Sequence, residues 1–161
     1  SCPLVLDADA IAVLAGTPET IRSASAPIVL TPHPGELALL LGTDVAAIQQ
    51  DRLAAARDAA ERTGAVVVLK GAGTLVAQTA QPHWINLNGN PGMACGGSGD
   101  VLAGLLAGLV AQGIAPGDAA CAAVWLQGTA GDIAALRTTQ IAMKAGDIAD
   151  ALPAAFRRVA K

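Results

Sequence analysis

Short apolar runs alternate along the chain with longer segments in which apolar residues recur at helical spacing. Each run is uncharged and is followed by polar or glycine residues, the pattern of strands that are buried on both faces of a sheet. A glycine-rich link after the third run predicts a hairpin that opens a small β-meander. The predicted elements are, in order, strand 4–6, helix 10–15, strand 28–30, helix 37–41, one continuous helix 43–63, strand 65–69, strand 74–77 and strand 84–87.

Three further helices are predicted after the meander. The first is the apolar run 101–111, whose small residues Ala103, Gly104, Ala107 and Gly108 suit close packing on a sheet. The other two are 119–136, in which the glycines of segment 128–131 predict a break, and 144–158. Alternating strands and helices followed by a meander predict a single α/β domain over 1–161, with layers around a mostly parallel central sheet.

Charge is scarce on this chain of 161 residues: 14% of them are charged, and the formal net charge is −3. No basic block occurs, which argues against binding to nucleic acid or to an anionic membrane surface. Because 53% of the residues are hydrophobic, we expect a second copy of the chain or a further segment to cover part of the surface. The longest apolar run, 101–111, is shorter than the about 20 residues that a membrane-spanning helix needs.

The three cysteines, Cys2, Cys95 and Cys121, are far apart and odd in number. This spacing fits neither a disulfide framework nor a metal site. The chain opens on an apolar strand, without the pattern of a signal peptide. We therefore expect reduced thiols and a cytoplasmic protein.

The stretch from Asn86 to Gln112 holds the strongest candidate chemistry. Its first half is rich in glycine, asparagine and proline and its second half is apolar, so a loop turns into a helix at Gly97-Ser98-Gly99-Asp100. Such a junction offers backbone N–H groups and the positive end of the helix dipole to an anion, most often a phosphate. We expect the N–H groups of Gly97, Ser98 and Gly99 to form an anion hole for a phosphoryl group in transfer.

Several familiar motifs are excluded at this junction. It is not a nucleophile elbow, because Asp100 stands where that motif needs glycine. Neither the Gly-Lys-Ser/Thr of a Walker A loop nor a complete Gly-x-Gly-x-x-Gly of a dinucleotide fold occurs. Two interpretations of Asp100 stay open: it accepts the proton of a hydroxyl that attacks a phosphoryl group, or it caps the helix.

Polar residues also follow the predicted parallel strands. Asp7 and Asp9 follow the first strand, His33 stands between two prolines after the second, and Lys70 follows the third. Ligands of such sheets bind beyond the carboxyl ends of the strands, so these residues are expected to converge on one cleft with the glycine loop. For each of them an ordinary role in a turn, a cap or a solvated strand end stays open. His83 has no comparable setting and is expected at the surface.

Five segments together resemble a known family. They are 4–11 (LVLDADAI), 30–36 (LTPHPGE), 68–75 (VLKGAGTL), 89–104 (GNPGMACGGSGDVLAG) and 128–132 (GTAGD). The Gly-x-Gly-Asp element alone is typical of the ribokinase-like superfamily, whereas Thr-Pro-His-Pro-Gly-Glu with Asn-Pro-Gly-Met-Ala is particular to the ATP/ADP-dependent NAD(P)H-hydrate dehydratases. Over nearly its whole length the chain resembles the C-terminal part of those dehydratases, which implies a ribokinase-like fold.

The resemblance implies a carbon–oxygen lyase that repairs NAD(P)H after hydration of its nicotinamide ring. ATP or ADP, accompanied by Mg²⁺, phosphorylates the ring hydroxyl, phosphate leaves, and NAD(P)H is regenerated. Asp100 is implied as the catalytic base, and no residue is assigned to a metal. By the same resemblance His33 and Asp100 contact the hydrated dinucleotide, while Lys70, Gly71, Ala72, Gly73, Thr74 and Gly99 lie along the nucleotide, with Glu36, Asn88 and Asn90 in support.

The chain departs from the family pattern in three places. Ser98 stands where the family usually has threonine and keeps the hydroxyl, and Gln127 stands where it often has histidine, near the site. A long segment that precedes the first strand in the family is absent, so we expect strand 4–6 to be an exposed edge that further polypeptide or a partner completes. A related kinase of vitamin-precursor hydroxymethyl groups and a catalytically incomplete nucleotide-binding module stay open as alternatives, and the Thr-Pro-His-Pro-Gly-Glu turn disfavours the kinase.

Overall fold

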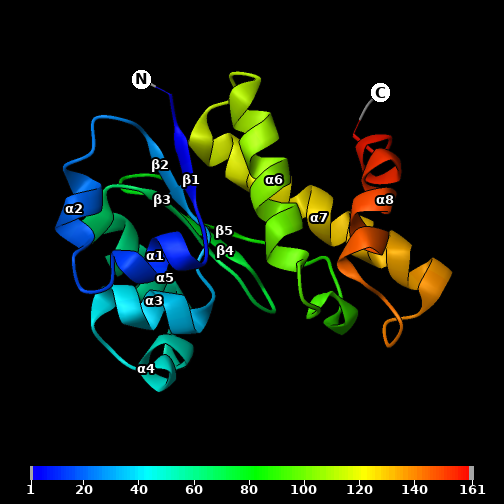
Figure 1. Cartoon of the computed structure of the whole chain (residues 1–161), viewed down its shortest axis with the longest axis horizontal. Coiled ribbons are helices and arrows are strands. Elements are labelled where there is room, and N and C mark those ends of the chain that lie inside the picture. The colour runs from blue at the N-terminus through cyan, green and yellow to red at the C-terminus, as the bar shows by residue number, and fades with distance from the viewer. Residues whose placement is uncertain (1, 160–161) are drawn as a thin grey trace.

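The computed structural model describes residues 2–159. Five strands form one mixed sheet in the order β1-β2-β3-β4-β5 (Figure 1). They are β1 Leu4–Leu6, β2 Ile28–Leu30, β3 Val66–Leu69, β4 Leu75–Ala77 and β5 Trp84–Ile85. The first three strands pair in parallel, and β4 and β5 continue the same sheet in the antiparallel sense. The predicted α/β class is confirmed, and the meander is the end of the main sheet.

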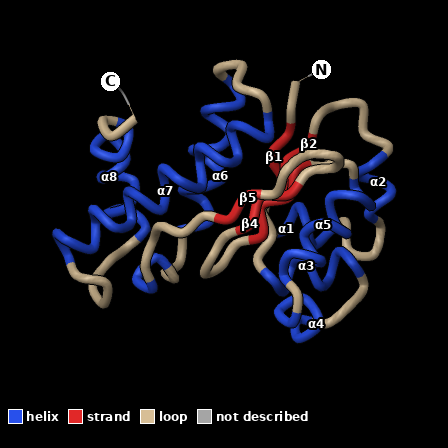
Figure 2. Tube along the Cα trace, turned by 180° about the vertical axis from the view of Figure 1, so that it is seen from behind, coloured by secondary structure: helices blue, strands red, loops and turns tan. Residues whose placement is uncertain are grey.

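Helices cover both faces of this sheet. Figure 2 shows the strands between two groups of helices, α1 to α5 on one side and α6 to α8 on the other. The helices are α1 Asp9–Val13, α2 Pro18–Arg22, α3 Pro34–Leu41, α4 Val45–Gln50, α5 Arg52–Thr63, α6 Ser98–Ala111, α7 Pro116–Thr138 and α8 Ala145–Phe156, with a 3₁₀ turn, η1, at Pro91–Met93. The three-layer arrangement places the ends of β1, β2 and β3 between the two helical layers.

The core follows from the side-chain alternation of the strands. Val66 and Val68 pack into the cluster formed with α6, α7 and α8, whereas Val67 and Leu69 pack into the cluster on the α1–α5 side. All four residues of β3 are buried, because helices cover both of its faces. This explains why β3 is the most apolar and β-branched strand of the chain.

The continuous helix predicted from 43 to 63 is wrong. The chain forms two helices there, and the break lies at Asp51, whose backbone is not helical (φ −144°, ψ 84°). Asp51 Oδ1 accepts the N–H of Ala54 at 2.9 Å, as Asp44 Oδ1 accepts the N–H of Ala47 at 2.7 Å. A short aspartate side chain competes for backbone N–H groups in this way, so the second aspartate starts a new helix.

Two predictions about the last three helices are also wrong. The glycines of segment 128–131 do not break α7, which continues from Pro116 to Thr138. On α6 the small residues do not face the sheet, because Gly104, Ala107 and Gly108 are exposed and the leucines of the opposite face, such as Leu106, are buried. Larger apolar side chains gain more from burial, which turns the helix this way.

The long helix α7 is apolar enough to raise the question of a membrane. By length and composition it could cross one, with a mean hydropathy of 1.2 over its most apolar window, and 61% of that window is buried inside the molecule. A core helix of a water-soluble protein meets the same test. Here α7 packs against α6, α8 and the strands of the sheet.

Candidate functional site

The carboxyl ends of the parallel strands bring three predicted site residues to one edge of the sheet. Asp7 follows β1, His33 lies three residues beyond β2, and Lys70 follows β3. The ladder continues past the strands, since Lys70 N–H donates to the carbonyl of Pro32 at 2.8 Å. The predicted convergence of these residues is therefore observed.

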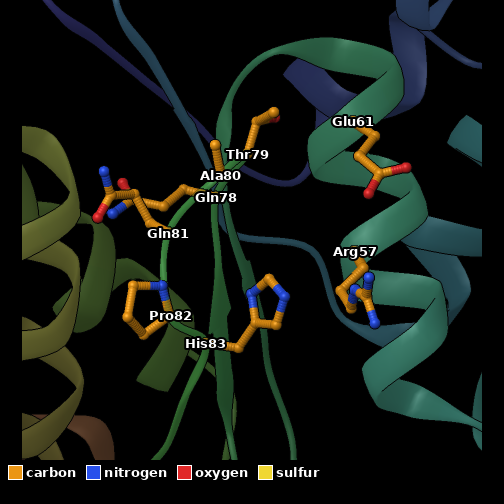
Figure 3. Close-up of a pocket in the computed structure, with 8 residues that line it drawn as sticks. All are labelled: Arg57, Glu61, Gln78, Thr79, Ala80, Gln81, Pro82 and His83. Carbon is orange, nitrogen blue, oxygen red and sulfur yellow. The ribbon is translucent and has the colours of Figure 1, made fainter.

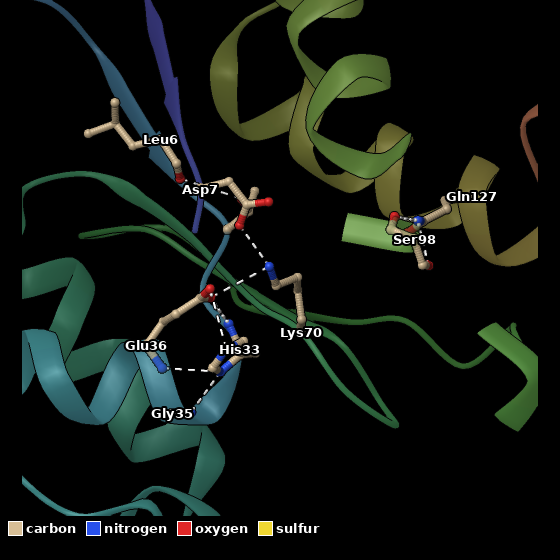
Figure 4. Close-up of polar contacts among 9 residues, drawn as sticks. Leu6, Asp7, His33, Gly35, Glu36, Lys70, Ser98 and Gln127 are labelled. Atoms are coloured by element: carbon tan, nitrogen blue, oxygen red, sulfur yellow. Dashed lines mark hydrogen bonds and ion pairs between the residues drawn. The ribbon is translucent and has the colours of Figure 1, made fainter. Parts of the chain in front are cut away.

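An ion-pair cluster forms at this edge (Figure 4). Lys70 Nζ lies 2.7 Å from Asp7 Oδ1 and 3.6 Å from Glu36 Oε2, and the three side chains are 21%, 14% and 11% exposed. Low exposure strengthens the attraction between the charges and restricts their motion. Two carboxylates around one ammonium group leave the cluster with a net negative charge, and they orient the Lys70 head group before any ligand arrives.

His33 caps α3 with one ring nitrogen and directs the other at the carboxylate of Glu36. Its Nδ1 accepts the N–H groups of Gly35 and Glu36, at 3.0 and 3.1 Å, while Glu36 Oε2 accepts the N–H of His33 at 2.6 Å. Because Nδ1 is an acceptor, the proton of the neutral imidazole is on Nε2. Nε2 lies 3.3 Å from Glu36 Oε1, and the ring is 56% exposed. Nε2–H thus faces Glu36, and a ligand that accepts this hydrogen bond would replace that carboxylate without disturbing the cap.

The glycine loop ends in a helix start with unused donors. Gly97, at φ +88°, precedes α6, and within the part of the chain that the structure describes the N–H groups of Gly97, Gly99 and Asp100 have no acceptor. Ser98 N–H donates to the carbonyl of Cys95 at 3.2 Å, so of the three predicted anion-hole donors it alone has a partner. An incoming anion would meet the remaining donors and the positive end of the α6 dipole.

Asp100 lies in the first turn of α6 and is exposed. Its carboxylate makes no capping hydrogen bond, and no described residue forms an ion pair with it. The structure thus gives no support to the interpretation in which Asp100 only caps the helix. An ionised carboxylate beside unused N–H groups suits the acceptance of a hydroxyl proton.

Gly99 lies where the glycine loop meets the ion-pair cluster. A Cβ atom at this position would lie 3.5 Å from Asp7 Oδ2 and 3.5 Å from Lys70 Nζ, which is ordinary van der Waals contact. Its φ is also that of any helical residue. Neither the backbone nor the neighbours require glycine here, so we interpret the missing side chain as room for a ligand above the cluster.

The predicted nucleotide loop, from Lys70 to Thr74, is an exposed turn. Gly71 has φ +140° and Gly73 φ +65°, conformations that other residues rarely adopt, and Thr74 Oγ1 donates to the carbonyl of Gly71 at 2.9 Å. Beneath the turn lies Arg52, the first residue of α5, which the sequence analysis did not single out. No local pattern predicts that contact, because residue 52 is separated from the loop by α5 and β3.

Asn88 and Asn90 contact α7, and so support the loop. Asn88 Nδ2 donates to Thr129 Oγ1 at 2.6 Å, and the carboxylate of Asp132 accepts from Asn90 Nδ2 and from the N–H of residue 89, both at 3.0 Å. Gln127 Nε2 donates to the carbonyl of Ser98 at 2.6 Å (Figure 4). Thr129 and Asp132 were not predicted as functional, although both lie in the GTAGD segment. The glycine loop is thus fixed to α7 from several points.

Two of the polar residues considered from the sequence lie outside this site. Asp9 begins α1, and no described residue forms an ion pair with its carboxylate. His83 is half-buried, not at the surface as predicted, and among the described residues its Nδ1 has no hydrogen-bond partner. It lines a cavity of about 350 Å³ with Arg57 and Glu61 of α5 and the segment that links β4 to β5 (Figure 3). That cavity shares no residue with the ion-pair cluster.

Within residues 2–159, no group of three or more histidine, cysteine, aspartate or glutamate side chains could hold a metal ion. The carboxylates of Asp7 and Glu36 are engaged by Lys70. A Mg²⁺ ion held chiefly by nucleotide phosphates and water fits these residues, since Mg²⁺ commonly takes only one or two carboxylate ligands.

Comparison with known proteins places this chain in a family. The model of the NAD(P)H-hydrate dehydratase family matches residues 1–154. The chain belongs to the NAD(P)H-hydrate dehydratase family. The resemblance of the five segments is therefore confirmed. Relatives are named as dependent on ADP or ATP, and one of them was crystallised with ATP and Mg²⁺.

Three relatives illustrate the match. The bifunctional NAD(P)H-hydrate repair enzyme Nnr of Moorella thermoacetica is 50% identical over 157 residues, which is 98% of this chain and 30% of that protein. The ADP/ATP-dependent NAD(P)H-hydrate dehydratase of Bacillus subtilis, crystallised with ATP and Mg²⁺, superposes with a TM-score of 0.87 at 32% identity, over 98% of this chain and 56% of that one. A ribokinase-like superfamily protein of Enterococcus faecalis gives a TM-score of 0.78 at 31% identity, over 96% and 52% of the two chains.

The structural match confirms the ribokinase-like fold class for this chain. The chain spans about half of the dehydratase structure and about a third of the bifunctional relative. The positions of its dehydratase motifs coincide with the site described above: TPHPGE supplies the cap of α3, KGAGT the exposed turn, and GGSGD the start of α6.

Proposed function

We propose that this chain carries the nucleotide and hydrate site of an ATP- or ADP-dependent (S)-NAD(P)H-hydrate dehydratase. One observation carries the proposal: the unpaired carboxylate of Asp100 lies among unused N–H groups at the start of α6, with Gly99 next to the Lys70 cluster. In a member of this family, that arrangement fits phosphoryl transfer to a hydroxyl better than any other reaction considered.

In the proposed reaction, the ring hydroxyl of the hydrated nicotinamide attacks the terminal phosphoryl group of the nucleotide, and the bond to the bridging oxygen breaks to release ADP from ATP or AMP from ADP. Asp100 accepts the hydroxyl proton, and the N–H groups of Gly97 and Gly99 face the charge that develops on the phosphoryl oxygens. The phosphate ester then leaves as inorganic phosphate while the ring loses a proton, which restores the double bond of NAD(P)H. His33 donates from Nε2 to the dinucleotide.

The net charge of the ion-pair cluster affects how an anionic nucleotide can bind. Asp7, Glu36 and Lys70 sum to a net negative charge, and Asp100 adds another, so an anionic nucleotide meets repulsion at this edge. Mg²⁺ bound to the phosphates lowers their charge and removes part of this repulsion. The residues from Lys70 to Thr74 hold the nucleotide by the N–H groups of an exposed turn, a common way to bind phosphate.

Location and assembly belong to the same proposal. The three cysteines of the chain are free, in keeping with a reduced, cytoplasmic compartment. Leu4 on the edge strand β1 is 46% exposed, as are other large apolar residues such as Leu87 and Ile141, to 90% and 99%. We propose that a second copy or further polypeptide covers part of this apolar surface.

Incubation with hydrated NADH and either MgATP or MgADP tests the function. We expect the near-ultraviolet absorbance of the reduced nicotinamide to recover with time, and inorganic phosphate to appear in equal amount. Phosphorylation of a hydroxymethyl vitamin precursor instead would favour a related kinase, and nucleotide binding without either reaction would favour an incomplete module. Absence of nucleotide binding would contradict all three.

A further inference from the structure

The guanidinium group of Arg52 lies directly beneath the turn that follows β3. Its Nη2 donates to the carbonyl oxygens of Leu69 and Lys70, at 3.3 and 3.2 Å, and its Nη1 donates to Gln49 Oε1 at 3.1 Å. These contacts join the start of α5 to the first residues of the proposed nucleotide loop. They span 17 and 18 positions of the sequence, so this is a tertiary contact.

This position is unfavourable for a cation in two respects. Arg52 is the first residue of α5, where the helix dipole favours negative charge. Burial lowers the pKa of its guanidinium, and no described carboxylate forms an ion pair with it. A charge placed here at a cost in stability needs a compensating role, and the two carbonyl oxygens are its principal partners.

The orientation of the peptide units shows what these contacts achieve. The carbonyl of Lys70 points at Arg52, and because a trans peptide is planar, the N–H of Gly71 points the opposite way. In residues 2–159 that N–H has no acceptor, so it remains available to a ligand. Arg52 thus holds the two carbonyl oxygens on its own side of the turn and leaves the N–H of Gly71 on the other side.

Packing fixes the same geometry. A Cβ atom at Gly71 would lie 3.0 to 3.3 Å from three atoms of the guanidinium, which is tighter than normal contact. The plane of Arg52 therefore fills the space under the turn, and the backbone of Gly71 rests on it. Without this group the carbonyls of Leu69 and Lys70 would lose a donor and the turn would lose its support.

We propose that Arg52 is a positioning residue for nucleotide binding, which holds the Lys70–Thr74 turn with the N–H of Gly71 directed at a nucleotide phosphate. This inference rests on the proposed function, because it takes the turn as the nucleotide site. Arg52 acts through the backbone of the turn and does not itself touch the phosphates.

The test compares Arg52→Met and Arg52→Lys with Arg57→Met in the purified chain. Arg57 lies on the same helix, is exposed, and forms no ion pair with a described residue, so it controls for loss of charge. We expect the Kd of MgATP to rise about 10- to 100-fold for Arg52→Met, the range for lost charged hydrogen bonds. The rise should be smaller for Arg52→Lys, which keeps the charge and a donor group, and Arg57→Met should bind as wild type.

Two readouts separate positioning from general destabilisation. The amide of Lys70, which donates to the carbonyl of Pro32, should exchange faster in unliganded Arg52→Met than in unliganded Arg57→Met, while exchange in β2 and α7 stays unchanged. In Arg52→Ala, added methylguanidinium should restore part of the nucleotide affinity by occupying the vacated space. Arg52→Lys remains as a milder variant if the other two fail to fold.

The outcomes also distinguish this inference from the proposed function. Unchanged Kd and unchanged exchange of the Lys70 amide in Arg52→Met would overturn the role of Arg52 even if the chain repairs hydrated NADH. Loss of affinity in that variant would support it even if the chain binds nucleotide without turnover. If the wild-type chain binds no MgATP, both proposals are wrong.

Discussion

The proposed role of Asp100 depends on its unpaired carboxylate and on the N–H groups beside it that have no acceptor among the described residues. Its carboxylate lacks a capping bond, so replacing it by the isosteric amide should cost little stability. We predict that Asp100→Asn slows turnover of hydrated NADH about 10²- to 10⁴-fold, the contribution expected of a general base. Steady-state rates and MgATP affinity measured on the same sample check this. Turnover within a few fold of wild type would remove Asp100 as the base.

Adding a single methyl group at Gly99 tests whether a ligand occupies the space above the ion-pair cluster. Helical geometry and ordinary contact distances allow alanine in the unliganded chain, and alanine favours a helix over glycine by about 1 kcal/mol. We therefore predict that Gly99→Ala is as stable as wild type, or more so, but binds MgATP at least about 10-fold more weakly. Urea unfolding and calorimetric titration check the two halves. Full affinity would show that no ligand approaches this position.

The candidate site was predictable at the residues that end strands. Asp7, His33 and Lys70 come directly after or close to apolar runs, and parallel strands bring such residues to one edge whatever the details of packing. Glu36 pairing with Lys70, and Arg52 beneath Gly71, were not predictable from such patterns. Those contacts depend on how the helices lie over the sheet, which no local pattern records.

At the scale of elements, the start of α3 combines a structural and a binding role in one imidazole. Nδ1 of His33 accepts two backbone N–H groups, so alanine should cost about 0.5–2 kcal/mol in the free energy of unfolding. Asparagine, a good N-cap, should restore most of that stability. We predict that His33→Asn is nearly as stable as wild type and His33→Ala is not, while both bind the hydrated dinucleotide weakly. Dinucleotide affinity equal to wild type in His33→Asn would leave His33 as a cap alone.

Element types followed from the sequence more reliably than their limits. The apolar run of β3 and the glycine that ends α5 mark those elements clearly, because β-branched residues and a left-handed glycine each favour one local conformation. The break at Asp51 and the unbroken α7 went against prediction. In both cases side chains decided the outcome, a cap in the first and close packing of other residues onto helix glycines in the second.

For the molecule as a whole, the segment 86–97 decides how the glycine loop sits relative to the sheet. It follows β5, forms hydrogen bonds with α7 and then leads into α6. The backbone N–H donors at the start of α6 therefore belong to a helical layer, whereas the ion-pair cluster lies at the ends of β1 to β3. The exposed apolar residues also belong to this scale, because several elements contribute to the surface that we propose a second copy or further polypeptide covers. Sequence composition indicated such a surface, but only the fold shows which residues compose it.

Gly128 tests this attachment, because a Cβ atom there would overlap the side-chain oxygen of Asn88 and lie 2.8 Å from its Cγ. Asn88 cannot move aside without losing its hydrogen bonds to α7. We predict that Gly128→Ala lowers the free energy of unfolding by about 1–3 kcal/mol, as overpacking does. Adding Asn88→Ala should cost less than the sum of the two changes, because the overlap is gone. Gly104→Ala, with open space around it, is the control and should not destabilise. Additive effects in urea unfolding would show that α7 does not hold the loop through Asn88.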